Sequence, residues 1–272
     1  MHRRDRLTRP ALVALLALHA SCTAPRDSTW NAPPKQRTAD LPPPAPTPRN
    51  IPAPRDAVSL HPAGAPSPVF AALDAYLLEN PIDRTAPDWR MRMPKPPAAI
   101  PLPRRSTCIW VLQTNHGALR FRLRPDLAPS HVRSTLWLTR AGYFDGLSFH
   151  RIIPGFVAQG GCPRGDGQGD PGYTLADEIP SPHPPHDRRG VLSAANAGPD
   201  TAGSQFFVTF RAAPWLDGSH TVFGELESGE EVLATLEAQG SPGGKPRKPV
   251  QILRADFLFR EPSDDPGPTT PR

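Results

Sequence analysis

The chain has 272 residues, a formal net charge of +5 at pH 7 and 39 prolines, far above the usual proline share of about 5%. Its arginines are scattered, without a basic stripe or an interleaved aromatic ladder, which argues against a nucleic-acid-binding protein. The sequence contains no H-E-x-x-H motif, zinc-type cysteine spacing, phosphate-binding loop or nucleophile elbow. We therefore predict that the protein uses no metal and no cofactor.

The N-terminus is typical of an export signal. A positive stretch, MHRRDRLTRP, precedes the apolar run ALVALLALHA, which is short for a membrane span. The run ends at Cys22, so residues 1–21 resemble a bacterial lipoprotein signal with Cys22 as the lipidated residue, although His19 stands where leucine is usual. We expect an exported protein of the cell envelope or periplasm, anchored to the membrane through Cys22. An ordinary secretory signal cut nearby and an uncleaved N-terminus are the alternatives.

Residues 22–105 are dominated by proline, alanine and arginine, as in LPPPAPTPRNIPAPRD. Such a segment cannot offset its ordering entropy with a core, so we predict a disordered, semi-extended tether. Residues 67–80, SPVFAALDAYLLEN, interrupt it with an amphipathic helix that Ser67 caps and Pro81 stops. We expect this helix to dock on the folded domain. The alternative is a helix that binds a partner.

Residues 106–260 have a different pattern, with short apolar strands separated by turn residues. Many short strands with few helices favour a mostly β protein, a closed antiparallel barrel with a helix at each end. The predicted strands are 108–115, 117–125, the two halves of 148–161 around the turn at Pro154-Gly155, 190–196, 204–210, 220–227 and 249–259.

Two helices are predicted within this domain. The first is 130–142, with Ser130 as its cap, and the second is 228–240, capped by Ser228 and stopped by Gly240. Residues 261–272 are expected to form a disordered tail.

The stretch SFHRIIPGFVAQGG, residues 148–161, carries polar side chains within apolar strands. Alternate residues of a strand face opposite sides, so Arg151 and Phe149 are expected on one face and His150 and Ile152 on the other. Arg151 would then face out into a groove while Ile152 fills the barrel.

Three blocks of sequence resemble the signature blocks of the cyclophilins, the cyclosporin-binding family of peptidyl-prolyl cis/trans isomerases. They are FHRIIPGFVAQGG (149–161), SAANAGPDTAGSQFFVTF (193–210) and WLDGSHTVFGEL (215–226). The resemblance runs from about Cys108 to Phe259. It implies an eight-stranded barrel capped by two helices, with the site on the outer barrel face. It also implies proline-containing polypeptide substrates and a cyclosporin-type ligand, and we expect a monomer.

The resemblance also implies roles for individual residues. Arg151 takes the place of the catalytic arginine, and Phe156 and Gln159 match further catalytic-site residues. Val157 stands where the best-known members have methionine, which we expect to change affinity rather than abolish activity. The residues matched to substrate binding are His150, Val157, Ala195, Asn196, Gln205, Phe207, Trp215, Leu216 and His220.

Two further cysteines, Cys108 and Cys162, stand in the domain, and Cys162 occupies a position where aspartate is usual. An exported compartment would permit a disulfide between them. We predict two free, partly buried thiols instead, because the sequence does not show that they are close.

The residues suit a reaction without a covalent step. Resonance gives the peptide bond a rotation barrier of about 18–20 kcal/mol, and a donor to the prolyl nitrogen would weaken that resonance. A permanently charged arginine can be this donor. We therefore predict isomerisation of X-Pro bonds in proteins folding in the cell envelope. The alternatives are a proline-peptide-binding or holdase module with incidental isomerase activity, and a structural envelope lipoprotein whose tether is the functional part.

Overall fold

The structure, a computed structural model, describes residues 67–103 and 106–260. The predicted signal segment 1–21, the lipidation residue Cys22, the tether up to residue 66 and the tail 261–272 all lie outside the described residues. Within the described ranges, we find no helix with the length and apolar character that a membrane crossing requires.

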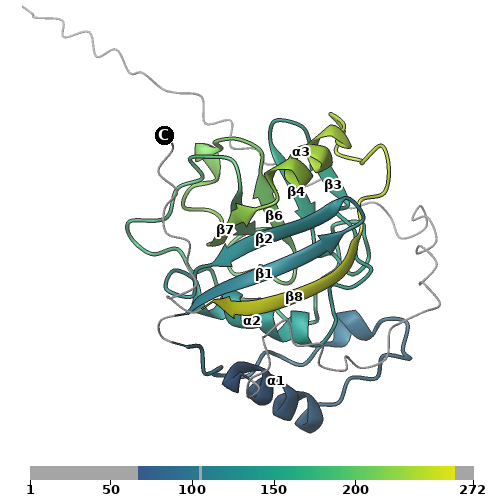
Figure 1. Cartoon of the computed structure of the whole chain (residues 1–272), viewed down its shortest axis with the longest axis vertical. Helices are drawn as coiled ribbons and strands as arrows, with labels where there is room; N and C mark the ends of the chain where they lie inside the picture. The colour runs from purple at the N-terminus through teal and green to yellow at the C-terminus, as the bar shows by residue number, and fades with distance from the viewer. Residues whose placement is uncertain (1–66, 104–105, 261–272) are drawn as a thin grey trace, which may run out of the picture. The chain divides into compact units, whose positions relative to one another are not determined.

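Eight strands form one antiparallel sheet in the order β3-β4-β6-β5-β7-β2-β1-β8 (Figure 1). All the predicted strands are present, so the mostly β prediction is confirmed. The strands are β1 (Thr107–Thr114), β2 (Gly117–Leu123), β3 (Arg151–Ile153), β4 (Val157–Gly160), β5 (Val191–Ala194), β6 (Phe206–Thr209), β7 (Val222–Ser228) and β8 (Ile252–Arg260).

The sheet curls until its two edge strands approach each other, but no ladder joins β3 to β8. The connection is made just ahead of both strands, by an isolated bridge between Ser148 and Gln251 and a 2.9 Å hydrogen bond from Phe149 N to Val250 O. Beyond that point the strands diverge, since Ile152 N bonds Gly244 O instead. The predicted closed barrel is therefore closed by a single bridge rather than by a continuous ladder.

Interlocked aromatic rings fill the inside of the curled sheet. The Trp110 ring lies 5.2 Å from Phe144 and 5.0 Å from Phe206 between centroids, and its Nε1 donates to Thr139 Oγ1 over 2.9 Å. Phe149 joins this core with 1% of its surface exposed and packs edge-on against Phe206. The prediction that Phe149 shares a face with Arg151 is therefore wrong, because β3 begins at Arg151 and strand alternation does not extend back to Phe149.

The two predicted helices of the domain are α2 (Pro129–Arg140), which contacts β8, and α3 (Glu230–Ala238), which contacts β2, β3 and β4. Ser130 does not cap α2, because Pro129 takes the first helical position and Ala128 is the N-cap. The Glu178 carboxylate accepts the Ser130 and His131 N–H groups over 2.8 and 2.9 Å, which a cap would otherwise do.

The cap of α3 also differs from the prediction. Ser228 is the last residue of β7, and Gly229, with φ of 103°, stands at the N-cap. A Cβ at residue 229 would lie 2.4 Å from Ala118 O, so the close approach of the chain to β2 requires glycine here.

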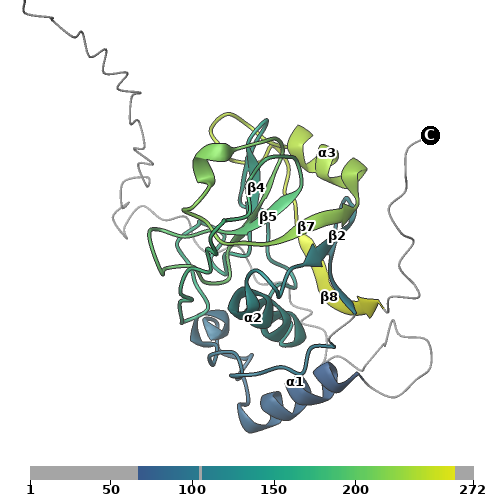
Figure 2. The same ribbon diagram turned by 90° about the vertical axis from the view of Figure 1, so that its left-hand side faces the viewer.

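The helix predicted at residues 67–80 is present as α1 (Pro68–Glu79), next to α2 in Figure 2. It docks on the domain as expected: the Tyr76 ring packs edge-on against Trp137, and Arg140 donates to Asp74 over 2.5 and 2.7 Å. Val69 and Leu73 are fully buried. Ser67 stands at the N-cap, but its side chain makes no capping hydrogen bond.

Residues 81–103, which we call the N-terminal strap, also pack against the domain. The strap contains a short 3₁₀ helix, Trp89–Arg92, and buries Trp89 and Met93 in the main core. From its proline-rich composition, we predicted that this segment belongs to the disordered tether. The difference arises because two large apolar side chains supply the buried area that the surrounding prolines lack.

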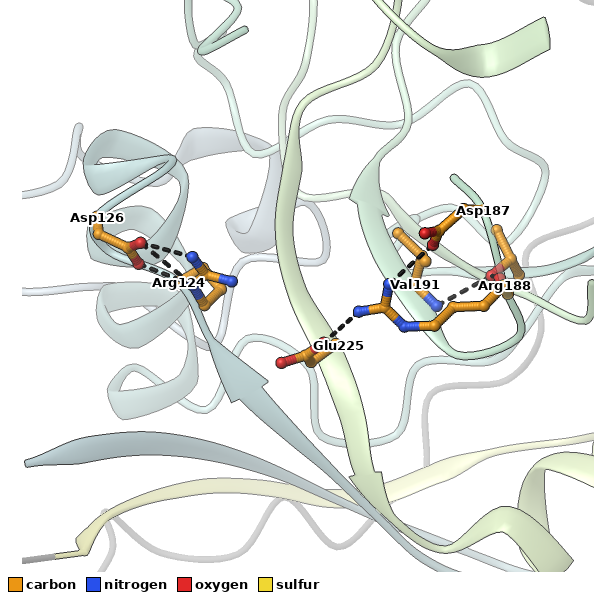
Figure 3. Close-up of polar contacts among 7 residues, drawn as sticks. Arg124, Asp126, Asp187, Arg188, Val191 and Glu225 are labelled. Carbon is orange, nitrogen blue, oxygen red and sulfur yellow. Dashed lines mark hydrogen bonds and ion pairs between the residues drawn. The ribbon is translucent and has the colours of Figure 1, made fainter. Parts of the chain in front are cut away.

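Ion pairs lie on β7, at Glu225, and beyond the end of β2, at Arg124 (Figure 3). Arg188, which precedes β5, donates to Asp187 and to Glu225 on β7, and Arg124 pairs with Asp126. Most of these groups are substantially exposed, so each pair contributes at most about 1 kcal/mol. These surface ion pairs therefore contribute little to the stability of the sheet.

Cys108 and Cys162 are both free, as predicted, but they are buried rather than partly buried. Burial raises the pKa of the Cys108 thiol well above its usual value, so this thiol stays protonated.

Candidate active site

A row of three polar side chains runs from β3 across β4 to Gln205, which directly precedes β6. Arg151 and Gln159 are direct partners in the β3–β4 ladder, and Arg151 Nη1 donates to Gln159 Oε1 over 3.2 Å. Gln159 Nε2 donates in turn to Gln205 Oε1 over 3.0 Å. Gln205 Nε2 donates to the carbonyl oxygens of Gly167 and Gly169, both at 2.9 Å.

These bonds determine which way each amide points. A primary amide has two N–H donors on one atom and an acceptor oxygen on the other. Both donors of Gln205 are used by the loop carbonyls, so its oxygen faces Gln159. The nitrogen of Gln159 must then face Gln205, which leaves its oxygen toward Arg151. The two carbonyl oxygens of the loop at residues 162–173 therefore fix the orientation of Gln205. Gln205 in turn fixes Gln159, so that the guanidinium of Arg151 meets the Gln159 oxygen.

Arg151 is partly buried, and this burial lowers the pKa of its guanidinium below the usual value. The group remains charged, because arginine starts from a pKa above 12. Its Cζ atom lies 5.8 Å from the centroid of the Phe156 ring. The site thus holds a partly desolvated cation beside an aromatic face, which strengthens its electrostatic effect on a nearby atom.

An apolar cluster lies beside the polar row. Trp215, in the 3₁₀ helix Pro214–Leu216, places its ring 5.8 Å from that of Phe156 at an interplanar angle of 33° and remains 58% exposed. The exposed tryptophan gives the cluster a side open to solvent. The cluster consists of buried Val157, Phe207, Ala213 and Leu216, with Phe156 and Ala195 packed against them.

The ends of β5 and β7 hold the remaining predicted residues. The Phe207 ring meets His220 edge-on at 5.2 Å, and His220 Nδ1 lies 3.1 Å from Ala194 O. A carbonyl only accepts, so Nδ1 carries the proton, and burial lowers the pKa of His220. Asn196 Nδ2 donates to Ser219 O over 2.9 Å. These bonds connect the chain after β5 to the segment that leads into β7.

His150 does not join the apolar cluster. Its ring lies against the loop, where a Cβ added at Gly167 would be 3.3 Å from His150 Nε2. Neither ring nitrogen has a hydrogen-bond partner among the described residues. Burial lowers the pKa of His150 to about 4, so its ring is neutral at pH 7.

A buried hydrogen-bonded group behind the cluster was not predicted. His186 Nδ1 lies 2.8 Å from Asp217 Oδ1, and its Nε2 lies 2.8 Å from Ser193 Oγ. The imidazole stacks on the Phe207 ring at 5.9 Å and is fully buried together with Ser193. Because a buried hydroxyl cannot reach a substrate, this is a support for Phe207 and not a nucleophile. The sequence contains Ser193 in a signature block, but no sequence pattern pointed to His186.

Nothing in the described ranges gathers three or more histidine, cysteine, aspartate or glutamate side chains in a way that could hold a metal ion. The site itself presents a guanidinium, two side-chain amides and an apolar surface.

Comparison with known proteins agrees with this geometry. Residues 109–257 match the family described as cyclophilin type peptidyl-prolyl cis-trans isomerase/CLD. Peptidyl-prolyl cis-trans isomerase B of Bacillus subtilis is 50% identical over 127 residues, which cover 47% of this chain and 88% of that protein. Peptidyl-prolyl cis-trans isomerase-like 2 of Cryptococcus neoformans is 46% identical over 166 residues, which cover 58% of this chain but only 28% of that longer protein.

Solved structures agree as well. The crystal structure of a Cryptosporidium parvum cyclophilin type peptidyl-prolyl cis-trans isomerase aligns with a TM-score of 0.53 and 35% identity, covering 56% of this chain and 98% of that one. A second crystal structure of that protein, determined in the presence of the dipeptide Ala-Pro, aligns with the same TM-score and 37% identity.

Proposed function

This chain belongs to the cyclophilin-type peptidyl-prolyl cis-trans isomerases, and we propose that it isomerises X-Pro bonds at the site around Arg151. The observation that carries this proposal is the oriented row from Arg151 through Gln159 to Gln205, beside the cluster of Phe156, Val157, Phe207 and Leu216. The charge and the apolar surface that the reaction needs are thus adjacent.

The proposed mechanism lowers the barrier without a covalent intermediate. As the C–N bond turns, the prolyl nitrogen loses conjugation with the carbonyl and becomes a hydrogen-bond acceptor. The Arg151 guanidinium donates to this nitrogen and favours the twisted state over either planar isomer. Gln159 holds the guanidinium in place by accepting from Nη1. Each tenfold in rate requires about 1.4 kcal/mol of such preference.

The remaining residues of the site hold the substrate while one side of the bond turns. Phe156, Val157, Phe207 and Leu216 receive the proline ring, and Trp215 and His220 border it. Ala195 and Asn196 bind the peptide backbone, with Gln205 on the opposite side. We place His150 outside this contact set, since its ring lies against the loop.

The substrates we propose are proline-containing polypeptides, and the same surface would accept a cyclosporin-type ligand that competes with them. The Cryptosporidium relative whose crystal structure was determined in the presence of the dipeptide Ala-Pro supports this proposal. Val157, which is 2% exposed, keeps this part of the surface apolar with a shorter side chain than methionine. A folded monomer is sufficient for the proposed reaction, because every named residue comes from one chain.

We further propose that the protein works in the cell envelope as a lipoprotein anchored through Cys22. The support is the charged, then apolar, then cysteine-ending order of residues 1–22. The mature mass and membrane fractionation test this directly. We expect acyl chains on Cys22 and recovery of the protein in the membrane fraction. An unmodified Cys22 would favour the alternatives, an ordinary secretory signal or an uncleaved N-terminus.

A second candidate function is a peptide-binding or holdase module in which isomerisation is incidental. The largely exposed Trp215 favours this reading, because it can bind apolar segments without taking part in bond rotation. A structural lipoprotein, the third alternative, would not require the oriented row. Catalytic turnover separates the first function from both others.

The first experiment is a rate measurement on the purified full-length chain with an X-Pro test peptide. We expect cis-to-trans isomerisation to accelerate in proportion to protein concentration, and a cyclosporin-type ligand to suppress it. A folded protein that binds the peptide without accelerating it would favour the binding module.

A further inference from the structure

We propose that the N-terminal strap positions the catalytic row, and that Trp89, Arg90 and Met93 are its positioning residues. This inference rests on the isomerase function proposed above. The strap lies before residue 109, where the match to the family begins. It nevertheless contacts the loop at residues 162–173, whose carbonyls orient Gln205.

The first connection runs through the end of that loop. Met93 N donates to Pro171 O over 2.9 Å. At Gly172, where φ is 90°, an added Cβ would lie 2.6 Å from Met91 O, so the two backbones are in direct contact. Pro171 also packs against Gly203, where a Cβ would lie 2.9 Å from its Cδ. The end of the loop is thus packed between the strap and the segment that precedes Gln205.

The middle of the loop is exposed, and contacts within the loop itself hold it, such as the bonds from Gly165 N to Cys162 O and from Gln168 N to Asp166 Oδ1. Residues 164–168 are exposed, while Gly169, Pro171 and Tyr173 are buried. A glycine-rich loop samples many backbone conformations unless its ends are held. The carbonyls of Gly167 and Gly169 must nevertheless meet both donors of Gln205 at 2.9 Å. Holding the loop end therefore reduces the freedom of the groups that orient the row.

The second connection runs through Tyr143. Arg90 donates to Tyr143 O over 2.8 Å and to Asp145 O over 2.7 Å, and its guanidinium lies 4.6 Å from the centroid of the Trp89 ring. The Trp89 ring meets Tyr143 edge-on at 6.3 Å and is 6% exposed. Tyr143 is therefore held by the strap from both its backbone and its ring.

Tyr143 passes this constraint to the strands of the site. Ser204 Oγ donates its single proton to Gly161 O over 2.8 Å, so the Tyr143 hydroxyl must donate to Ser204 across their 2.7 Å contact. Ser204 directly precedes Gln205, and Gly161 follows Gln159 by two residues. Both connections from the strap therefore end beside the two amides that orient Arg151.

The test compares strap variants with a variant that destabilises the same N-terminal region without touching the loop. In the full-length chain, Trp89→Ala and Arg90→Ala are expected to lower kcat about fivefold to twentyfold with little change in KM. Leu73→Ala, in α1, serves as the stability-matched control and is expected to keep the wild-type kcat. Trp89→Phe retains a ring against Tyr143 and is expected to recover most of the rate.

A second measurement keeps the proposal testable if a variant folds poorly or if turnover is absent. The side-chain amide resonances of Gln159 and Gln205 are expected to shift in Trp89→Ala and in Gly172→Ala, which pushes on the strap from the loop side, but not in Leu73→Ala. Unchanged resonances in both variants, or equal losses of kcat in Trp89→Ala and Leu73→Ala, would overturn the positioning role. Wild-type protein without turnover would count against the proposed function alone.

Discussion

Arg151 Nη1 donates to Gln159 Oε1 over 3.2 Å, and the two residues face each other as direct partners in the β3–β4 ladder. The oxygen of Gln159 meets the guanidinium only because its nitrogen is engaged by Gln205. A reversed amide would place N–H groups against a cation. The position of the Arg151 guanidinium therefore depends on Gln159 and, through it, on Gln205.

Gln205→Glu tests the contribution of the two loop carbonyls, because a carboxylate still accepts from Gln159 Nε2 but cannot donate to them. The carboxylate has no N–H groups for the Gly167 and Gly169 carbonyls and would place a negative charge against two acceptors. We expect kcat/KM to fall about tenfold or more, equivalent to about 1.4 kcal/mol. Gln168→Glu, which makes the same change in the exposed middle of the loop, is the control and should keep the wild-type rate. Equal rates in both variants would contradict the role of the loop carbonyls and Gln205 in positioning Arg151.

The buried, neutral ring of His150 predicts a loss of stability in mild acid. Its pKa is about 4 in the folded protein against 6.5 for an ordinary histidine, so between these values only the unfolded chain binds the proton. The free energy of unfolding should therefore decrease as pH falls through this window, by up to about 3 kcal/mol for this residue. Denaturant unfolding at several pH values measures the slope.

His186 and His220 shift in the same direction, so they add to the slope of the wild-type protein. The difference between wild type and His150→Gln isolates the His150 contribution. The variant is expected to lose less stability between pH 6.5 and 4. Identical slopes in the two proteins would show that His150 can be protonated in the folded state.

Two leucines of α1 test whether the docked helix stabilises the folded unit. Leu73 is fully buried, whereas Leu78 is 84% exposed on the same helix. Leu73→Ala should lower the free energy of unfolding by about 3 kcal/mol, because it removes buried apolar area and leaves a cavity. Leu78→Ala should change it by less than about 0.5 kcal/mol. Similar small effects at both positions would mean that α1 contributes little to the stability of the domain.

The strands and the residues of the site could be predicted because they stand in long, specific blocks of sequence. Arg151, Gln159 and Gln205 come from two of these blocks, and sheet pairing brings them into contact. Strand alternation also placed Ile152 in the core correctly. It failed for Phe149, since the regular strand starts only two residues later.

Features supplied by distant segments could not be predicted from local sequence. Glu178 binds the N-terminal N–H groups of α2, so the local serine is not its cap. The His186 contacts join Ser193 and Asp217, which are close only after folding. Trp89 and Met93 were overlooked because composition averaged over a proline-rich segment conceals two buried side chains.

The most direct measurement follows both turnover and binding of an X-Pro peptide in full-length Arg151→Ala. Arg120→Ala, an exposed arginine on β2, is the matched control. A donor to the prolyl nitrogen predicts that Arg151→Ala loses about 100-fold in catalytic rate, or about 2.7 kcal/mol, while peptide affinity changes only a few-fold and Arg120→Ala behaves as wild type. Full turnover in folded Arg151→Ala would contradict catalysis by this arginine.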